Sequence, residues 1–175
     1  TRLYAQLSGA GALPRYLGRR LGLVGPEDEA LPVEVTFEAA PSVLWDAVVL
    51  PAGSESAEAL ASDDHVVEFV MQQWRHNKAM LVPQSATAIL TAAGIDVEGL
   101  GHWAAEDASA DTAFEAAPGL LLVPDDALMN ALEPFITCVA MHRAHRRFNG
   151  NAMVPPATDV SSDRAAGEEA ALAVD

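Results

Sequence analysis

Two strand-to-helix units follow one another between residues 46 and 95, and they restrict the chain to a small set of folds. Residues 46–50 and 79–82 are apolar enough to form buried strands, and each is followed by a turn and by helical sequence. Uninterrupted apolar strands in strand–helix–strand order are typical of a parallel sheet with helices on both faces, so we predict an α/β fold. Ligands and catalytic groups gather at the carboxyl ends of such strands.

The helix between these two strands has clear end signals. It is predicted over 63–77, where Ser62 or Asp63 can cap the first turn, and Asn77 with Lys78 ends it. An apolar stripe at helical spacing is expected to face the sheet. The stripe consists of Val66, Phe69, Val70 and Trp74.

Further elements are predicted on both sides of this region. A helix is expected over 86–93, a third buried strand over 120–123 and a last helix over 133–148, since Pro134 fits only in a first turn. The remaining predictions are a helix over 1–8, strands over 13–17 and 21–24, and a half-exposed strand over 32–37.

The two ends of the sequence suggest how the domain is bounded. The helix over 1–8 has no capping residue ahead of it, so we expect this chain to be a piece of a longer one. Residues 149–175 contain Pro155-Pro156, small polar residues and an Ala/Glu-rich end. We therefore predict one domain over 1–148 and an extended tail over 149–175.

The composition excludes several classes of function. A net charge of −15 repels phosphates and anionic headgroups, so neither nucleic acid nor a membrane is an expected partner. The single Cys138 excludes an internal disulfide and a cysteine-based metal cage. Because no apolar run approaches the roughly 20 residues of a membrane span and no signal peptide is visible, we expect a soluble, cytoplasmic protein.

The turn after the second strand is the strongest candidate for chemistry. Pro83-Gln84-Ser85 is a sharp strand-to-helix turn of the kind that can present a nucleophile to a helix N-terminus. Ser85 would need a base within hydrogen-bond reach, and the sequence offers none that is obvious. We favour a structural turn. The turn at Pro51-Ala52-Gly53-Ser54 lacks the length and the lysine of a phosphate-binding loop.

The histidines and the cysteine are weaker candidates. His142 and His145 lie three residues apart on the predicted last helix, but neighbouring arginines at positions 143, 146 and 147 disfavour a divalent cation. We interpret these arginines as cations at a helix C-terminus. His65 and His76 are expected to face solvent. Cys138 is expected to be a buried, small hydrophobic residue, and His102 to lie in a loop.

Four motifs in register resemble one protein family. They are LPVEVTF followed by APS (31–42), DAVVLPAG (46–53), WRHNKA (74–79) and AMHR (140–143). This set resembles the C-terminal domain of large-subunit haem catalases over roughly residues 3–148. The resemblance implies the flavodoxin-like fold of the class I glutamine amidotransferase superfamily, as three layers with the family's first strand missing from this chain.

The same resemblance implies what the domain does not do. Active members of the wider superfamily place a cysteine at the elbow, and counting back from Ala93-Gly94 puts that position on Gln84, with Ser85 as its neighbour. We therefore expect no catalytic residue, metal or cofactor in this chain, and haem in the N-terminal region of the parent. The expected partners are the rest of the catalase subunit and its neighbours in a homotetramer.

The favoured function is accordingly a non-catalytic accessory domain that supports stability, assembly or haem access in a catalase that converts hydrogen peroxide to water and oxygen. Two alternatives stay open. One is an active hydrolase or amidotransferase-like enzyme that uses Ser85. The other is a chaperone-like interaction module.

Overall fold

The computed structural model describes residues 2–25, 30–97 and 119–142 of the 175-residue chain. Its centre is a parallel three-stranded sheet in the order β5–β6–β7. The strands are β5 (Ala47–Val49), β6 (Ala79–Pro83) and β7 (Leu120–Val123). They are the three buried strands that the apolar runs predict, although β5 is only half-buried.

Side chains of β6 and β7 alternate between two hydrophobic clusters, one on each face of the sheet. Met80 and Leu120 belong to the first cluster, whereas Leu81 and Leu121 belong to the second. Every residue of both strands is buried, as expected for parallel strands covered on both sides.

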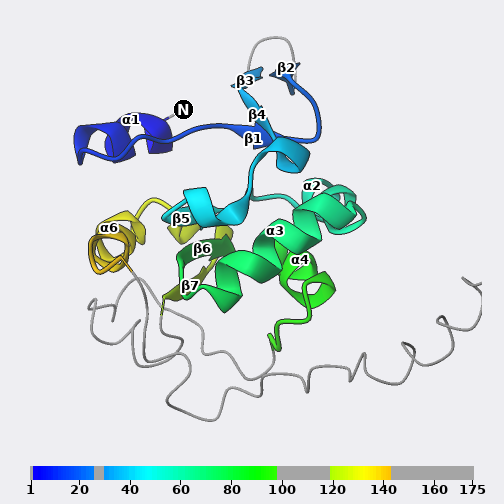
Figure 1. Cartoon of the computed structure of the whole chain (residues 1–175). Helices are drawn as coiled ribbons and strands as arrows, with labels where there is room; N and C mark the ends of the chain where they lie inside the picture. The colour runs from blue at the N-terminus through cyan, green and yellow to red at the C-terminus, as the bar shows by residue number, and fades with distance from the viewer. Residues whose placement is uncertain (1, 26–29, 98–118, 143–175) are drawn as a thin grey trace, which may run out of the picture.

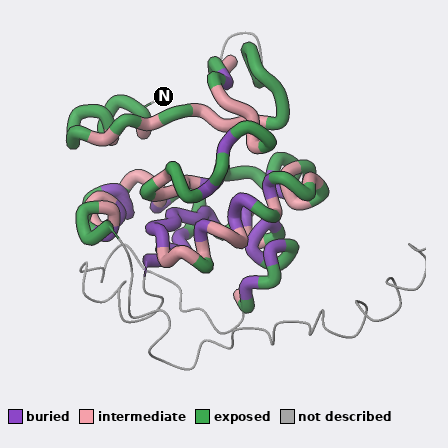
Figure 2. The backbone as a smooth tube through the Cα atoms, in the orientation of Figure 1, coloured by how far each residue is buried: buried purple, intermediate pink, exposed green. Residues whose placement is uncertain are grey.

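Helices cover both faces. Helices α2 (Ser54–Ala61), α3 (Asp64–Arg75) and α4 (Thr87–Ala92) contribute to the first cluster, and α6 (Leu132–Ala140) contributes to the second. Leu3 and Leu7 of α1 (Arg2–Gly9) pack against the second cluster as well. Figure 1 shows the resulting three layers, and in Figure 2 the buried residues concentrate in the sheet and on the helix sides that face it. The predicted three-layer, flavodoxin-like α/β fold is confirmed.

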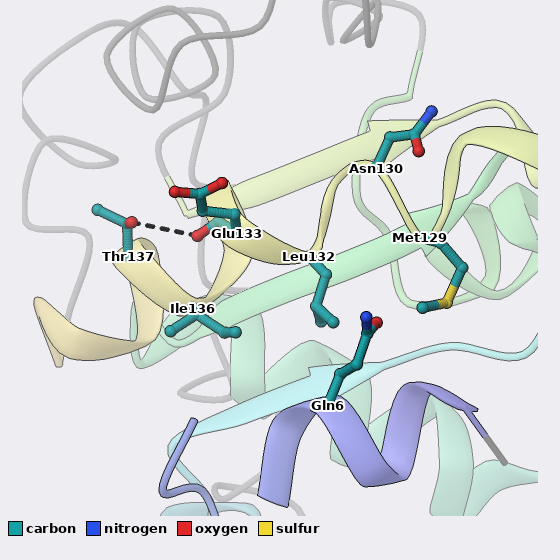
Figure 3. A pocket seen from close by; sticks show the side chains of 7 residues that line it. All are labelled: Gln6, Met129, Asn130, Leu132, Glu133, Ile136 and Thr137. Atoms are coloured by element: carbon teal, nitrogen blue, oxygen red, sulfur yellow. Dashed lines mark hydrogen bonds between the residues drawn. The ribbon is translucent and has the colours of Figure 1, made fainter. Parts of the chain in front are cut away.

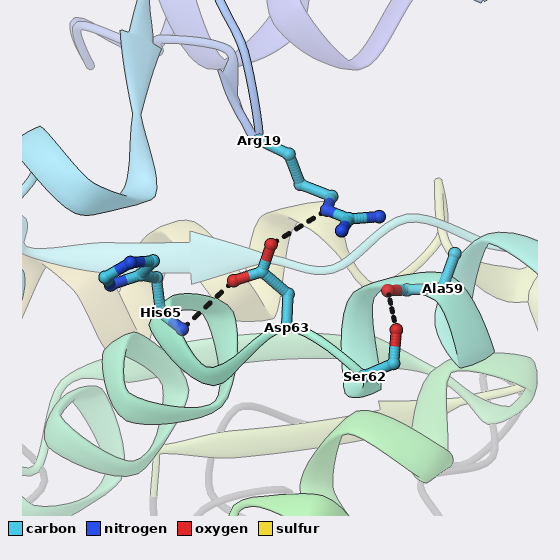
Figure 4. A network of polar contacts seen from close by, with 5 residues as sticks. All are labelled: Arg19, Ala59, Ser62, Asp63 and His65. Carbon is cyan, nitrogen blue, oxygen red and sulfur yellow. Dashed lines mark hydrogen bonds and ion pairs between the residues drawn. The ribbon is translucent and has the colours of Figure 1, made fainter.

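The predicted long helix corresponds to α3, and both of its ends follow the sequence signals. The Asp63 carboxylate accepts a hydrogen bond from the backbone N–H of His65 at 3.0 Å and another from Arg19 Nε at 2.8 Å (Figure 4). At the other end, Asn77 has a φ of 58°, which stops the helix. The expected stripe packs inward, with Val66, Phe69 and Val70 buried and Trp74 half-buried.

Several short helical segments were not predicted. Helix α2 precedes α3 as a separate element, and only Ala57 of α2 is buried, which explains its weak apolar pattern. The other unpredicted segments are the 3-10 turns η1 (Phe37–Ala39), η2 (Ser42–Leu44) and η3 (Gln84–Ala86). A fourth 3-10 turn, η4 (Asp125–Ala127), follows Pro124, after which the sequence is helical in character. In the described ranges no helix has the length and apolarity needed to cross a membrane.

The region before β5 differs from the prediction in two places. The strand expected over 13–17 is wrong: strand β1 is confined to Leu17–Gly18, after Pro14, which cannot donate a backbone hydrogen bond. The strand expected over 32–37 is divided at Glu34, whose N–H donates to the Tyr16 carbonyl. Strand β3 (Leu31–Val33) pairs antiparallel with β2 (Gly22–Val24), whereas β4 (Val35–Thr36) pairs parallel with β1.

The last described helix is shorter than predicted. Helix α6 ends at Ala140, because His142 adopts a φ of 65° and its N–H donates to the Val139 carbonyl. The predicted C-terminal part of this helix and the tail over 149–175 lie outside the described residues.

Strand β5 is an edge strand of the described sheet. It pairs with β6 on one side, and within the described ranges no strand pairs with its other side. Ala47, Val48 and Val49 are all half-buried, although their apolar character is typical of an interior strand.

We predict that Asp63→Ala lowers the free energy of unfolding by about 1–2 kcal/mol, since it removes the cap of α3 and a partly exposed ion pair. Asp63→Asn keeps a capping oxygen and should lose only about 0.5 kcal/mol. Urea unfolding monitored by circular dichroism measures both values. Equal losses for the two variants would contradict the capping role.

The same carboxylate should make stability depend on pH. Burial alone would raise the pKa of Asp63, but hydrogen bonds from Arg19 and from the backbone amides of His65 and Val66 hold the pKa below its ordinary value. The carboxylate therefore contributes stability above its unfolded-state pKa and loses it as the pH falls through the lowered folded-state pKa. We expect the advantage of the wild type over Asp63→Asn to be complete at pH 7 and to disappear in this acidic window.

Candidate functional site

The carboxyl ends of the three parallel strands meet at one edge of the sheet, where this type of fold places its functional groups. Each strand is followed there by a turn. The turns carry Gly53 after β5, Ser85 after β6 and Asp125 after β7. Gly53 has a φ of 109°, which favours glycine, and directly precedes α2.

Ser85 joins these three turns through two hydrogen bonds. Its Oγ accepts from the backbone N–H of Gly53 at 2.8 Å, and its own backbone N–H donates to Asp125 Oδ1 at 3.0 Å. Sequence reasoning singled out Ser85 but missed Asp125. The available signal was the position of Asp125, directly after Pro124 at the end of the third strand.

The geometry around Ser85 is that of a structural turn. Its hydroxyl oxygen already accepts a backbone hydrogen bond, and in the described residues no side chain is hydrogen-bonded to it as a base would be. Gln84 and Ser85 lie in the 3-10 turn η3, and neither has the positive φ of a strained backbone. A nucleophile elbow requires a sharp, strained turn with a base nearby.

Gln84 is the first residue after β6, and its side chain is exposed. It therefore lies at the strand-to-helix junction where the superfamily resemblance puts the catalytic cysteine. An amide side chain has no proton to give up near neutral pH and is not a nucleophile. The assignment of Gln84 as the elbow position stays a prediction.

The three histidines that the structure describes, His65, His76 and His142, do not form a common metal site. His65 is exposed, as expected, whereas the expectation for His76 is wrong in part: it is half-buried, and its Nδ1 is buried without a hydrogen-bond partner. His142 lies beyond the end of α6, and its Nδ1 is 3.3 Å from Asp46 Oδ1. His102 and His145 lie outside the described residues. Across the described ranges, no three His, Cys, Asp or Glu side chains converge as metal ligands would.

Asp46 also neutralises a buried cation. Lys78 is 2% exposed, and its Nζ lies 3.3 Å from the Asp46 carboxylate. Asp46 and Lys78 precede β5 and β6, so this contact lies at the opposite edge of the sheet from Ser85. A buried ammonium group needs a paired anion, so we interpret the contact as structural.

Cys138 is buried in the second hydrophobic cluster, as predicted. A pocket of about 440 Å³ lies nearby, between α1 and α6, and is lined by Gln6, Met129, Asn130, Leu132, Glu133, Ile136 and Thr137 (Figure 3). The Thr137 hydroxyl donates to the Glu133 carbonyl. Glu133 is the one titratable residue of the lining, so the pocket lacks an acid–base pair.

A parallel sheet between helix layers, with a strand–turn–helix junction at its functional edge, places the protein in the DJ-1/ThiJ/PfpI class of α/β folds. The ThiJ/PfpI domain protein from Brachyspira murdochii superimposes with a TM-score of 0.61 at 12% identity, over 80% of this chain and 87% of that one. A second match is a two-domain protein from Anabaena variabilis, which has DJ-1/ThiJ/PfpI-like and ferritin-like domains. It superimposes with a TM-score of 0.59 at 16% identity, over 79% of this chain and 42% of that one.

Within this fold class, the chain belongs to the family described as the C-terminal domain found in long catalases, which matches residues 1–148. Catalase HPII from Pseudomonas putida is 32% identical over 155 residues, which span 88% of this chain and 18% of the relative. Catalase HPII from Mycobacterium avium is 30% identical over 125 residues, which span 71% of this chain and 17% of the relative. The chain thus spans less than a fifth of the length of these relatives. The resemblance seen in the sequence motifs is confirmed.

We predict that Ser85→Ala lowers the free energy of unfolding by about 1 kcal/mol, because the Gly53 N–H loses its acceptor. The exposed Ser56 of α2 offers a matched control, and Ser56→Ala should be neutral or slightly stabilising. Thermal and urea unfolding of both variants measure the effect. A Ser85→Ala protein as stable as the Ser56→Ala control would show that the hydrogen bond contributes nothing.

Proposed function

We propose that the chain is a non-catalytic C-terminal accessory domain of a long haem catalase, whose parent protein converts hydrogen peroxide to water and oxygen. Family membership supports the parent, and the state of Ser85 supports the absence of catalysis. The hydroxyl of Ser85 accepts the Gly53 amide and has no base among the described residues. This observation carries the non-catalytic part of the proposal.

The described residues do not fit a haem site of their own. Haem iron in proteins is held by an axial His, Cys, Met or Tyr. Cys138 is packed inside a hydrophobic cluster, His142 contacts Asp46, and the rings of Tyr4 and Tyr16 stack on each other at 5.3 Å. The pocket between α1 and α6 has no His, Cys or Tyr in its lining, and Met129 is the one residue of that lining that could act as an axial ligand, so a second axial ligand is lacking there. In the proposal, haem is therefore bound elsewhere in the parent.

The accessory role is structural. Ser85 and Asp125 connect the ends of all three strands through hydrogen bonds. In the proposal, these bonds give the strand-end edge a fixed surface, whereas related folds use this edge for catalysis. Such a surface suits a domain that supports subunit stability, assembly of a homotetramer or access to haem. The proposal also includes a cytoplasmic location, which is supported by the presence of a single, buried cysteine.

The decisive experiment measures the haem spectrum and the peroxide consumption of the full-length natural protein. We expect a haem Soret band and peroxide consumption in the full-length protein, because its active centre lies outside this chain. Ser85→Ala in the full-length protein should leave both unchanged. A colourless full-length protein that does not consume peroxide would overturn the proposal.

The rival, a hydrolase that uses Ser85, predicts a different outcome. A fluorophosphonate probe labels serines that a base activates. We expect no labelling of Ser85 in the full-length protein, with trypsin as the positive control. Labelling that disappears in Ser85→Ala would favour the hydrolase over the accessory domain.

A further inference from the structure

The chain contains two tyrosines among its 175 residues, and the fold brings their rings together. Tyr4 lies in α1, and Tyr16 directly precedes β1. Their ring centroids are 5.3 Å apart and their planes differ by 23°, which is a stacked arrangement. The other aromatic pair of the described residues, Phe37 with Phe69, meets edge to face at 72° and has no phenol group.

The two tyrosines belong to segments that separate contacts hold in place. Helix α1 has no buried residue, and its Leu3 and Leu7 pack against the second hydrophobic cluster (Figure 2). The backbone carbonyl of Tyr16 accepts a hydrogen bond from the N–H of Glu34 at 3.1 Å, which fixes Tyr16 beside the β1–β4 pair. Residues 12–16 form neither helix nor strand. Since an element with few buried contacts opens at a low free-energy cost, α1 can shift relative to Tyr16.

Both rings are accessible from solvent. Tyr4 is 36% exposed and Tyr16 is half-buried, so a small dissolved oxidant can reach the pair. A stack at this separation is in itself an ordinary packing contact. What distinguishes the pair from two stacked phenylalanines is its chemistry, because a phenol can lose an electron and its hydroxyl proton to a one-electron oxidant.

We propose that Tyr4 and Tyr16 form an oxidation site at which a one-electron oxidant joins the two rings as dityrosine. Each phenol loses one electron to the oxidant and its hydroxyl proton to solvent, which leaves two phenoxyl radicals. A carbon–carbon bond then forms between one ring carbon ortho to the oxygen on each tyrosine. The hydrogen on each of these carbons is transferred to the oxygen of its own ring. Both phenols are restored, and the net change is the loss of two electrons and two protons.

The fold favours this coupling because it holds the two rings in contact. Groups held together react as in a unimolecular step, whereas two dissolved phenols must first meet. Dityrosine joins rings at their edges, so the stack must slide as the bond forms, and the weak packing of α1 permits that shift. The product fastens α1 to the β1–β4 pair by closing a covalent loop between Tyr4 and Tyr16. The inference is independent of the proposed function, since the site requires only an oxidant of this class.

The test exposes the full-length natural protein to tris(bipyridine)ruthenium(III), a one-electron oxidant produced by light and persulfate. Trypsin cleaves after arginine, so digestion separates Tyr4, in residues 3–15, from Tyr16, in residues 16–19. We expect mass spectrometry to find these two peptides joined, at their summed mass less two hydrogens. Recovery of the two peptides unlinked, whether intact or oxidised to catechols, would overturn the proposal.

Conservative variants provide the matched controls. Tyr4→Phe and Tyr16→Phe each keep two stacked rings and remove one phenol, so each should abolish the joined peptide and leave the circular dichroism spectrum unchanged. In urea the wild type should give at least about tenfold less of the joined peptide, because the rings are then connected only by flexible chain. An equal yield from folded and unfolded protein would show that the fold does not promote the reaction, and would overturn the proposal.

A mixture of isotope-labelled and unlabelled protein identifies the chains that are joined. We expect both halves of the joined peptide to carry the same label, since the stack lies within one chain. Joined peptides with one labelled and one unlabelled half would come from two chains and would contradict the proposed site.

Hydrogen exchange measures the effect on α1. The cross-link should slow exchange of the α1 amides by at least about tenfold in the oxidised full-length protein, because the closed loop limits the states to which α1 can open. Oxidised Tyr16→Phe protein is the control and should keep the exchange rates of the untreated protein. Unchanged rates in the cross-linked wild type would refute the fastening of α1.

Discussion

Burial of β6 and β7 on both faces is the constraint on which the rest of this domain depends. Leu81 and Leu121 need a helix layer on one side of the sheet, whereas Met80 and Leu120 need one on the other. Burying a large apolar side chain contributes about 1.5–3 kcal/mol, so leaving either face uncovered would remove most of the stabilisation. Helices α3, α4 and α6 meet this requirement, while the parallel pairing of β5, β6 and β7 brings the strand ends, and with them Ser85, together.

The strand-end edge of this fold can hold either a reactive group or a structural turn. A nucleophile needs a free oxygen or sulfur, a base and a strained turn that exposes it. Here the serine hydroxyl accepts a backbone amide, and the turn has ordinary negative φ values. Asp125, which could in principle act as a base, accepts from the Ser85 amide through Oδ1 and thus fixes the turn. Gly53, Ser85 and Asp125 therefore connect the ends of the three strands through hydrogen bonds.

Local sequence signals predicted the elements whose ends are set by local chemistry. The cap at Asp63 and the left-handed Asn77 limit α3, and continuous apolar runs define β6 and β7. Elements whose ends depend on distant partners were mispredicted. The run over 32–37 divides because its two halves pair with different strands, and α6 stops where His142 turns to meet Asp46. The role of Asp125 was not predicted for the same reason, since its hydrogen-bond partner Ser85 lies 40 residues away in the sequence.

Within the described residues, the domain is well packed at β6 and β7 and more exposed on the side formed by its first 50 residues. The outer edge of β5 pairs with no described strand, and the β2–β3 hairpin turns leucines outward. Open edges and exposed apolar faces promote aggregation unless they are covered, and a net charge of −15 opposes contact between separate copies. Within the described residues, the exposed apolar side chains thus lie on an acidic domain whose charge opposes self-association.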